Sequence, residues 1–133
     1  MSFLLDTHAF VWSVIEPKRL GAKSREVIAD SANEVFVSAV TFWEISLKAA
    51  LGKLKLEGCR PETLLEAGLA QAFNYLPLSP EDASTFHHLP RTEHKDPFDR
   101  MLIWQAVRGS HTLVTQDSGI RRAYRAHRLA TLW

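Results

Sequence analysis

Short apolar runs alternate with segments of helical periodicity along the chain, and this alternation restricts the fold more than any other feature. The first example is Phe3-Leu4-Leu5, which is followed by a segment, 7–15, whose apolar residues recur at helical spacing until Pro17. Strands that alternate with helices form units in which the strands are parallel and helices cover both faces of the sheet. The sequence therefore predicts an α/β fold with a central, largely parallel sheet of about five short strands.

The other elements follow from the same periodicities and from residues that start or end helices. Ser79 before Pro80, and Asp96 before Pro97, are typical of helix starts, because Ser and Asp cap helices and proline fits the first helical position. Expected strands cover 3–5, 34–38, 75–78, 111–115 and 130–133, and expected helices cover 7–15, 24–32, 40–51, 61–73, 97–108 and 118–127, with one more from residue 80. With no linker or repeat, residues 1–133 are expected to form a single domain.

Composition excludes several classes of protein. Hydrophobic residues make up 46% of the chain and charged residues 23%, which is typical of globular proteins and not of disordered ones. The apolar runs are shorter than the roughly 20 residues of a membrane helix, and the first residues lack the basic region of a signal peptide. With Cys59 as the only cysteine, we expect a cytoplasmic protein without a disulfide and without a membrane partner. A formal net charge of +1 leaves any contact with RNA to local basic patches.

Four acidic residues are placed where parallel α/β folds bind ligands. Asp6 and Asp117 each follow a predicted strand, so their side chains share one crevice if those two strands are neighbours. Glu44 and Asp99 lie in the first turns of helices that begin at the same edge. Each acid alone is commonly a turn residue or a helix cap. Together the carboxylates would repel by about 4 kcal/mol per close pair at an effective dielectric near 20, so the cluster needs a cation.

An all-oxygen set of ligands favours Mg²⁺ or Mn²⁺, which retain water molecules that substrate phosphates can replace. Such an ion lowers the pKa of an attacking water and stabilises the leaving oxygen. The residues thus predict hydrolysis of a phosphodiester, in which Asp6, Glu44, Asp99 and Asp117 are both metal ligands and catalytic residues. Asp96 is expected mainly to cap a helix, and a further role as a ligand is left open.

Residues near the acids are candidates for supporting roles. Thr7, Ser38 and Thr115 are expected to orient carboxylates or waters, although each also suits local capping. Lys95 and Arg100 flank the proposed metal loop and are expected to contact substrate phosphate. Arg121 begins a series of arginines that either bind RNA phosphates or an acidic segment of a partner, or form a solvated helix face.

Four motifs, in this order, resemble those of the PIN-domain nucleases. They are Leu-Leu-Asp6-Thr-His, Trp43-Glu44-Ile-Ser, Asp96-Pro-Phe-Asp99-Arg-Met-Leu-Ile and Leu-Val-Thr115-Gln-Asp117. The likeness covers nearly the whole chain, and the run from Asp96 to Arg100 is similar to that of the bacterial VapC-type toxins. The resemblance implies a Rossmann-like PIN fold, Mg²⁺- or Mn²⁺-dependent endoribonuclease activity, a homodimer and neutralisation by a cognate VapB-type antitoxin. It also implies that Asp6, Glu44, Asp99 and Asp117 are the acidic tetrad.

Two other functions remain open. A phosphohydrolase with Asp6 as a covalent nucleophile usually has a second aspartate two residues later, where this chain has His8. A non-catalytic RNA- or protein-binding module on the same fold would keep its binding without the acids and without metal. Phe42, Trp43 and the leucines near them form either core or an exposed apolar groove, because a dimer and an antitoxin helix both need apolar surface.

Overall fold

The chain folds around a five-stranded sheet in the computed structural model, which describes residues 1–56 and 58–133. Its strands are β1 (Ser2–Leu5), β2 (Glu34–Ser38), β3 (Asn74–Leu76), β4 (Thr112–Val114) and β5 (Thr131–Leu132). The strand order is β3-β2-β1-β4-β5, and every neighbouring pair is parallel. The predicted α/β class, with its parallel sheet, is confirmed.

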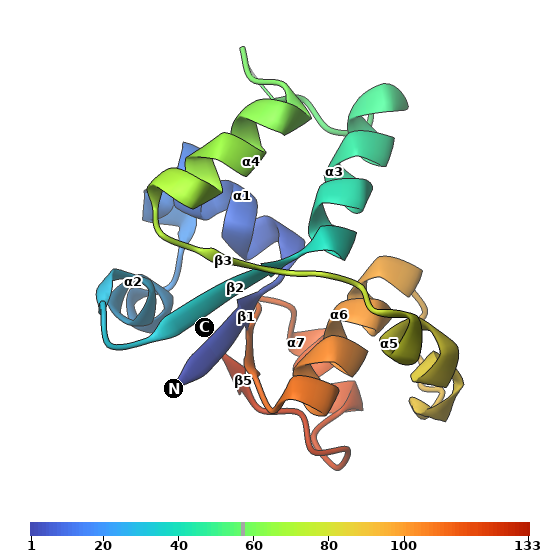
Figure 1. Ribbon diagram of the computed structural model, residues 1–133. Helices are drawn as coiled ribbons and strands as arrows, with labels where there is room; N and C mark the ends of the chain where they lie inside the picture. Colours follow the sequence, from blue (N-terminus) through green and yellow to red (C-terminus); the bar gives the residue numbers. More distant parts are fainter. Residues whose placement is uncertain (57) are drawn as a thin grey trace.

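Helices pack on both sides of this sheet. They are α1 (Thr7–Ile15), α2 (Ala22–Ala29), α3 (Ala39–Ala50), α4 (Pro61–Ala70), α5 (Pro80–Thr85), α6 (Pro97–Gly109) and α7 (Ser118–Ala123), with short 3₁₀ helices at Pro17–Arg19 and Phe86–His88. Figure 1 shows α1 and α4 on one side of the sheet and α5 and α6 on the other. In the part of the chain that the structure describes, no helix has the length and apolar character needed to cross a membrane.

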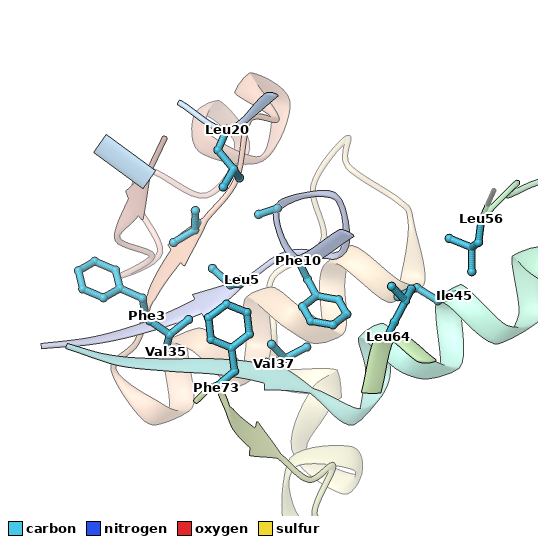
Figure 2. Close-up of a cluster of buried hydrophobic side chains, with 12 residues drawn as sticks. Phe3, Leu5, Phe10, Leu20, Val35, Val37, Ile45, Leu56, Leu64 and Phe73 are labelled. Atoms are coloured by element: carbon cyan, nitrogen blue, oxygen red, sulfur yellow. The ribbon is translucent and has the colours of Figure 1, made fainter. Parts of the chain in front are cut away.

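The sheet has a hydrophobic core on each face, and the central strand β1 contributes side chains to both. Phe3 and Leu5 point into one core, where they meet Phe10 from α1 and Leu64 from α4 (Figure 2). Leu4 points into the other core, which the helices α6 and α7 cover. Successive side chains of a strand face opposite sides, so a strand covered on both faces reads as a continuous apolar run. This explains why Phe3, Leu4 and Leu5 are all apolar.

The register of β1 and β4 decides where the acidic residues meet. Leu5 pairs with Val114, and the backbone amide of Asp6 donates to the Val114 carbonyl over 3.0 Å. The two strands are therefore neighbours, as the placement of Asp6 beside Asp117 requires. Both carboxylates follow their strands at the same edge of the sheet.

The largest difference from the predicted elements is the end of α7, which stops at Ala123 and not near residue 127. The side chain of Tyr124 is fully buried, and the chain from there to Arg128 turns, with Arg128 at a positive φ of 62°. Burial of the tyrosine ring outweighs the helical preference of the arginines around it. The helix face, one of the two interpretations of the arginine series, is therefore limited to Arg121 and Arg122.

Candidate active site

The acidic residues line one cleft at the edge where the parallel strands end. This cleft has a volume of about 560 Å³, and its wall includes Asp6, Glu44, Asp96, Asp99 and Asp117. His8, Trp12, Arg19 and Lys48 complete much of the remaining wall. The structure thus brings together the four predicted acids and the fifth, Asp96, whose role the sequence left open.

Helix starts position three of these acids. Asp6, Asp96 and Asp117 are the N-caps of α1, α6 and α7, and each accepts a hydrogen bond from the first turn of its helix. The Oδ1 of Asp6 accepts from the amide of Ala9 over 2.8 Å, and that of Asp96 accepts from the amide of Asp99 over 3.0 Å. The capping role predicted for Asp96 is confirmed. Because helix N-termini favour negative charge, the fold can hold several carboxylates at one edge.

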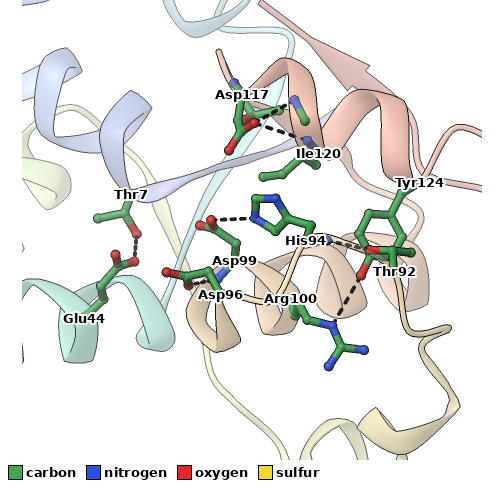
Figure 3. A network of polar contacts seen from close by, with 12 residues as sticks. Thr7, Glu44, Thr92, His94, Asp96, Asp99, Arg100, Asp117, Ile120 and Tyr124 are labelled. Atoms are coloured by element: carbon green, nitrogen blue, oxygen red, sulfur yellow. Dashed lines mark hydrogen bonds and ion pairs between the residues drawn. The ribbon is translucent and has the colours of Figure 1, made fainter.

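Glu44 reaches the cleft from the middle of α3 and is only 3% exposed. Its Oε1 accepts from the hydroxyl of Thr7 over 2.6 Å, and its Oε2 accepts from the amino group of Lys48, one helical turn later. The hydroxyl of Thr41 lies 3.3 Å from that of Thr7 and extends this network. Glu44 is therefore held in one orientation by residues of α1 and α3 (Figure 3).

Burial makes negative charge costly on two of the other acids. It raises the pKa of Asp6 from 3.8 to about 6, although hydrogen bonds from the Thr115 hydroxyl and the Ala9 amide act in the opposite direction. Burial also raises the pKa of Asp99, and the nearby carboxylates of Asp96 and Glu44 raise it further. Within residues 1–56 and 58–133, neither Asp6 nor Asp99 forms an ion pair with lysine or arginine. A divalent cation would supply the missing positive charge.

The donor atoms present fit such a cation. Single ligand atoms of His94, Asp99 and Asp117 all lie within 4.8 Å of one another. Carboxylate oxygens are the ligands that Mg²⁺ and Mn²⁺ bind best in proteins. The cleft therefore has the charge and the donor chemistry of a divalent metal site, with Asp6 and Asp99 as the acids that most need the ion.

Two residues of the site were missed by sequence reasoning. His94 precedes the cap of α6 by two positions, and its Nε2 lies 3.0 Å from Oδ2 of Asp99. Its place in the polar loop next to an Asp-Pro helix start was the available signal. For Lys48 the signal was its spacing of four residues from Glu44, which places the two side chains together on α3.

The basic residues predicted to bind RNA lie outside the acidic cleft. Arg100 donates to the Leu89 carbonyl and the Tyr124 hydroxyl, each over 3.3 Å, and its guanidinium lies 4.9 Å from the centre of the Phe86 ring. Figure 3 shows it pointing away from the acids, so the prediction that it contacts substrate phosphate is not supported. Lys95 lines a neighbouring pocket of about 220 Å³, which His94 and Arg100 also line, and Arg121 is exposed on α7.

The hydroxyls of Ser38 and Thr115 have different roles. Ser38 donates to Oε1 of Gln105 over 2.5 Å and caps α3 by accepting from the amide of Val40 over 3.0 Å. It joins α3 to α6 and does not orient a carboxylate, so the capping alternative holds for Ser38. Thr115 is fully buried and accepts from the amide of Asp117 over 3.1 Å, and its hydroxyl also stabilises the charge of Asp6.

Known proteins share both the sequence pattern and the fold. Residues 3–126 match the family model of the PIN domain. The chain is 30% identical over 130 residues to Ribonuclease VapC22 of Mycobacterium tuberculosis, and the match covers 98% of this chain and 97% of that protein.

Solved structures with the same fold include VapBC2 from Rickettsia felis bound to a promoter DNA fragment. Its TM-score is 0.71 at 16% identity, over 99% of this chain and 98% of that chain. DNA-bound VapBC from Salmonella typhimurium has a TM-score of 0.68 at 17% identity, over 99% of this chain and 97% of that chain. At these identities the structural matches show the fold alone.

Proposed function

The chain belongs to the PIN domain family, and on that premise we propose that it is a metal-dependent endoribonuclease whose residues 1–133 form a single domain. The observation that carries the proposal is the meeting of Asp6, Glu44, Asp99 and Asp117 in one cleft. The relative at 30% identity over almost its whole length is named a ribonuclease, which supports RNA as the substrate.

Three of the acids hold the ion in this proposal, and Glu44 completes the cluster. A bound Mg²⁺ or Mn²⁺ would supply an activated water and positive charge for the phosphate. Asp6, Asp99 and Asp117 hold the ion, with Asp96 as a further candidate, and the Thr115 hydroxyl stabilises the charged form of Asp6. Glu44, fixed by Thr7 and Lys48, completes the set of carboxylates at the cleft wall.

A groove that joins the cleft offers a path for the RNA strand. It has a volume of about 490 Å³ and shares His8, Trp12, Arg19, Glu44 and Lys48 with the acidic cleft. Lys55 adds a third cationic side chain to this groove, and the guanidinium of Arg19 lies 4.5 Å from the centre of the Trp12 ring. Cations contact the RNA backbone, and aromatic or guanidinium planes accept stacked bases. We propose that this groove binds RNA in place of Lys95, Arg100 and Arg121.

We further propose that the chain is the toxin of a toxin–antitoxin pair and that it forms a homodimer. Structural neighbours such as VapBC from Salmonella typhimurium are complexes of such pairs. On this chain, α3 and α4 expose a set of large apolar side chains that we call the apolar face: Trp43, Leu47, Leu51, Leu65 and Leu69. Trp43 is 62% exposed, so it is surface and not core.

Next to the apolar face, a groove of about 470 Å³ runs between α3, α4 and β3. Phe42, Leu65 and Tyr75 contribute to its largely apolar wall. An amphipathic helix binds such a groove through its apolar side. We propose that a segment of a VapB-type antitoxin occupies this groove.

The decisive experiment is cleavage of a mixed pool of structured RNAs by the purified chain. Reactions contain Mg²⁺, Mn²⁺ or EDTA, and wild type is compared with Asp6→Asn and Asp99→Asn. The matched control is Asp30→Asn, which changes an exposed aspartate that accepts a hydrogen bond from the amide of Ala32 in a surface turn.

We expect cleavage by wild type and the control, and none in EDTA or with the two site variants. Cleavage that survives both site substitutions or EDTA contradicts the proposal. An acyl-phosphate trapped on Asp6 would instead favour a phosphohydrolase. RNA binding without cleavage, independent of metal and of the acids, would indicate a binding module.

A further inference from the structure

His94 lies inside the proposed metal site, although it is outside all four sequence motifs. Its side chain is 16% exposed, and its Nε2 lies 3.0 Å from Oδ2 of Asp99. On the other side of the ring, Nδ1 faces the start of α7, since a Cβ added at Gly119 would lie 3.8 Å from it. The backbone amide of His94 donates to the Thr92 hydroxyl over 3.1 Å, which holds this part of the loop in a turn.

The imidazole therefore lies between the starts of α6 and α7, which carry Asp99 and Asp117 (Figure 3). The ligand atoms of these three residues lie within 4.8 Å of one another. In an octahedral site with metal–ligand distances of about 2.1 Å, ligand atoms lie about 3.0 Å apart when adjacent and about 4.2 Å apart when opposite. The 3.0 Å between Nε2 of His94 and Oδ2 of Asp99 suits two adjacent ligands, and a rotation of the exposed Asp117 side chain would bring the third atom to the ion.

We infer that His94 is a nitrogen ligand of the divalent cation and that it shifts the preference of the site from Mg²⁺ toward Mn²⁺. The inference rests on the metal site of the proposed function. Mg²⁺ has a strong preference for oxygen ligands, whereas imidazole nitrogen binds first-row transition ions better. An all-carboxylate site lacks this basis for discrimination, so the histidine would distinguish this chain from a site built only from the acidic tetrad.

Two alternative roles would also bring His94 into contact with Asp99, and each predicts a different result. A protonated His94 that only neutralises Asp99 would have to leave when the cation binds, so its removal would strengthen the binding of Mg²⁺ and Mn²⁺ alike. A His94 that only fastens the loop would change stability when removed, but it would have no bond to the ion. Ligation predicts weaker binding of Mn²⁺ and a bonded nitrogen.

Pulsed electron paramagnetic resonance of Mn²⁺ bound to the full chain tests the bond directly, because a coordinated imidazole couples its nitrogen nucleus to the electron spin. We compare wild type, His94→Gln and His8→Gln. His8 is the matched control because it lines the acidic cleft but is not one of the three residues whose ligand atoms lie together. We expect nitrogen coupling in wild type and in His8→Gln, and its loss in His94→Gln.

Titration with Mn²⁺ and with Mg²⁺ adds a readout of selectivity. His94→Gln should lower the affinity for Mn²⁺ by about tenfold or more and that for Mg²⁺ by clearly less, so the ratio of the two falls. Stronger binding of both ions, or an unchanged ratio, overturns the inference.

The wild-type spectrum needs no variant and keeps the inference testable if His94→Gln fails to fold. Bound Mn²⁺ without nitrogen coupling removes only the role of His94 and leaves the ribonuclease proposal intact. A wild-type chain that binds no divalent cation at all removes the metal site, and the proposed function with it.

Discussion

The acidic cleft and the apolar face are built on the same helix, α3, and they are completed in different ways. Glu44 and Lys48 point into the cleft, where each has a hydrogen-bonded partner inside the chain. Trp43 and Leu47, one position earlier in each case, belong to the exposed apolar face. The cleft therefore needs only a cation to balance its charge, whereas the apolar face needs a macromolecule to cover it.

Asp99→Asn should have the largest effect, and it should impair the cleft without affecting the apolar face. We expect the rate of RNA cleavage to fall by about a hundred- to a thousandfold, because a charge that stabilises the reacting phosphate through the metal is lost. Self-association measured by sedimentation should be unchanged, since Asp99 lies in the cleft and not on the apolar face. Dissociation of the Asp99→Asn dimer would show that the cleft and the apolar face do not act independently.

The pH dependence of stability should reveal the charge imbalance in the cleft. The pKa of Asp6 is raised to about 6 in the folded chain, so the folded state holds a proton that the unfolded state releases near pH 4. Without metal, the free energy of unfolding should then fall as pH rises from about 4 to above 6, by up to about 3 kcal/mol.

Denaturant titrations in EDTA of wild type and Asp6→Asn check this expectation. The advantage of Asp6→Asn over wild type should grow with pH in the same window, because asparagine carries no charge there. Added Mn²⁺ should reduce the difference, since the ion stabilises only the charged carboxylate. Parallel pH profiles for the two proteins would show that Asp6 carries no unfavourable charge.

A substitution in the apolar groove between α3 and α4 should weaken antitoxin binding and leave RNA cleavage unchanged. Leu65→Glu places a charge in the wall of the apolar groove, and we expect its dissociation constant for the antitoxin to rise by about thirtyfold or more. Cleavage by the chain without antitoxin should be retained. Leu69→Glu is the matched control, because Leu69 is exposed on the same helix but is not part of the groove wall.

Calorimetry with the cognate antitoxin and a cleavage assay on the same samples separate the two effects. Equal losses of antitoxin binding in both leucine variants would indicate the wider apolar face as the contact. If only self-association weakens, the groove is occupied by a second copy of the chain.

A smaller effect is expected for Arg19→Ala, which removes a cation from the junction of the cleft and the RNA groove. We expect kcat/KM to fall by about tenfold or less, and the dependence of binding on salt to decrease by about one ion. Lys23→Ala on α2 is the control. An equal loss in the control would mean that general charge, and not this groove, attracts the RNA.

Sequence reasoning placed the acidic tetrad because its members depend on local rules. Asp6 and Asp117 follow strands and cap helices, and Asp99 follows an Asp-Pro start, so short stretches of sequence determine their positions. The alternation of strands and helices likewise determined the fold class. The neighbouring positions of β1 and β4 were only a condition of the prediction, because pairing across the chain leaves no local signal.

The features that the sequence did not predict concern residues whose neighbours are distant in sequence. Arg100 is held by Leu89 and Tyr124, and the burial of Tyr124 also ends α7 early. Ser38 reaches Gln105 across the interface of α3 and α6. His94 belongs to the site only because its loop folds over the starts of two helices. Tertiary packing decides such contacts, and periodicity contains no information about it.

Because β1 lies in the middle of the sheet, the proposed active site can form only after the later strand β4 has been made. Strand β1 is made early, but its neighbour β4 and the cleft residue Asp117 come late in the sequence. At ordinary translation rates, on the order of ten seconds separates Asp6 from Asp117. Until then a nascent chain holds its acids apart and cannot assemble the proposed nuclease. The proposed antitoxin would therefore act only on molecules in which Asp117 has already been made.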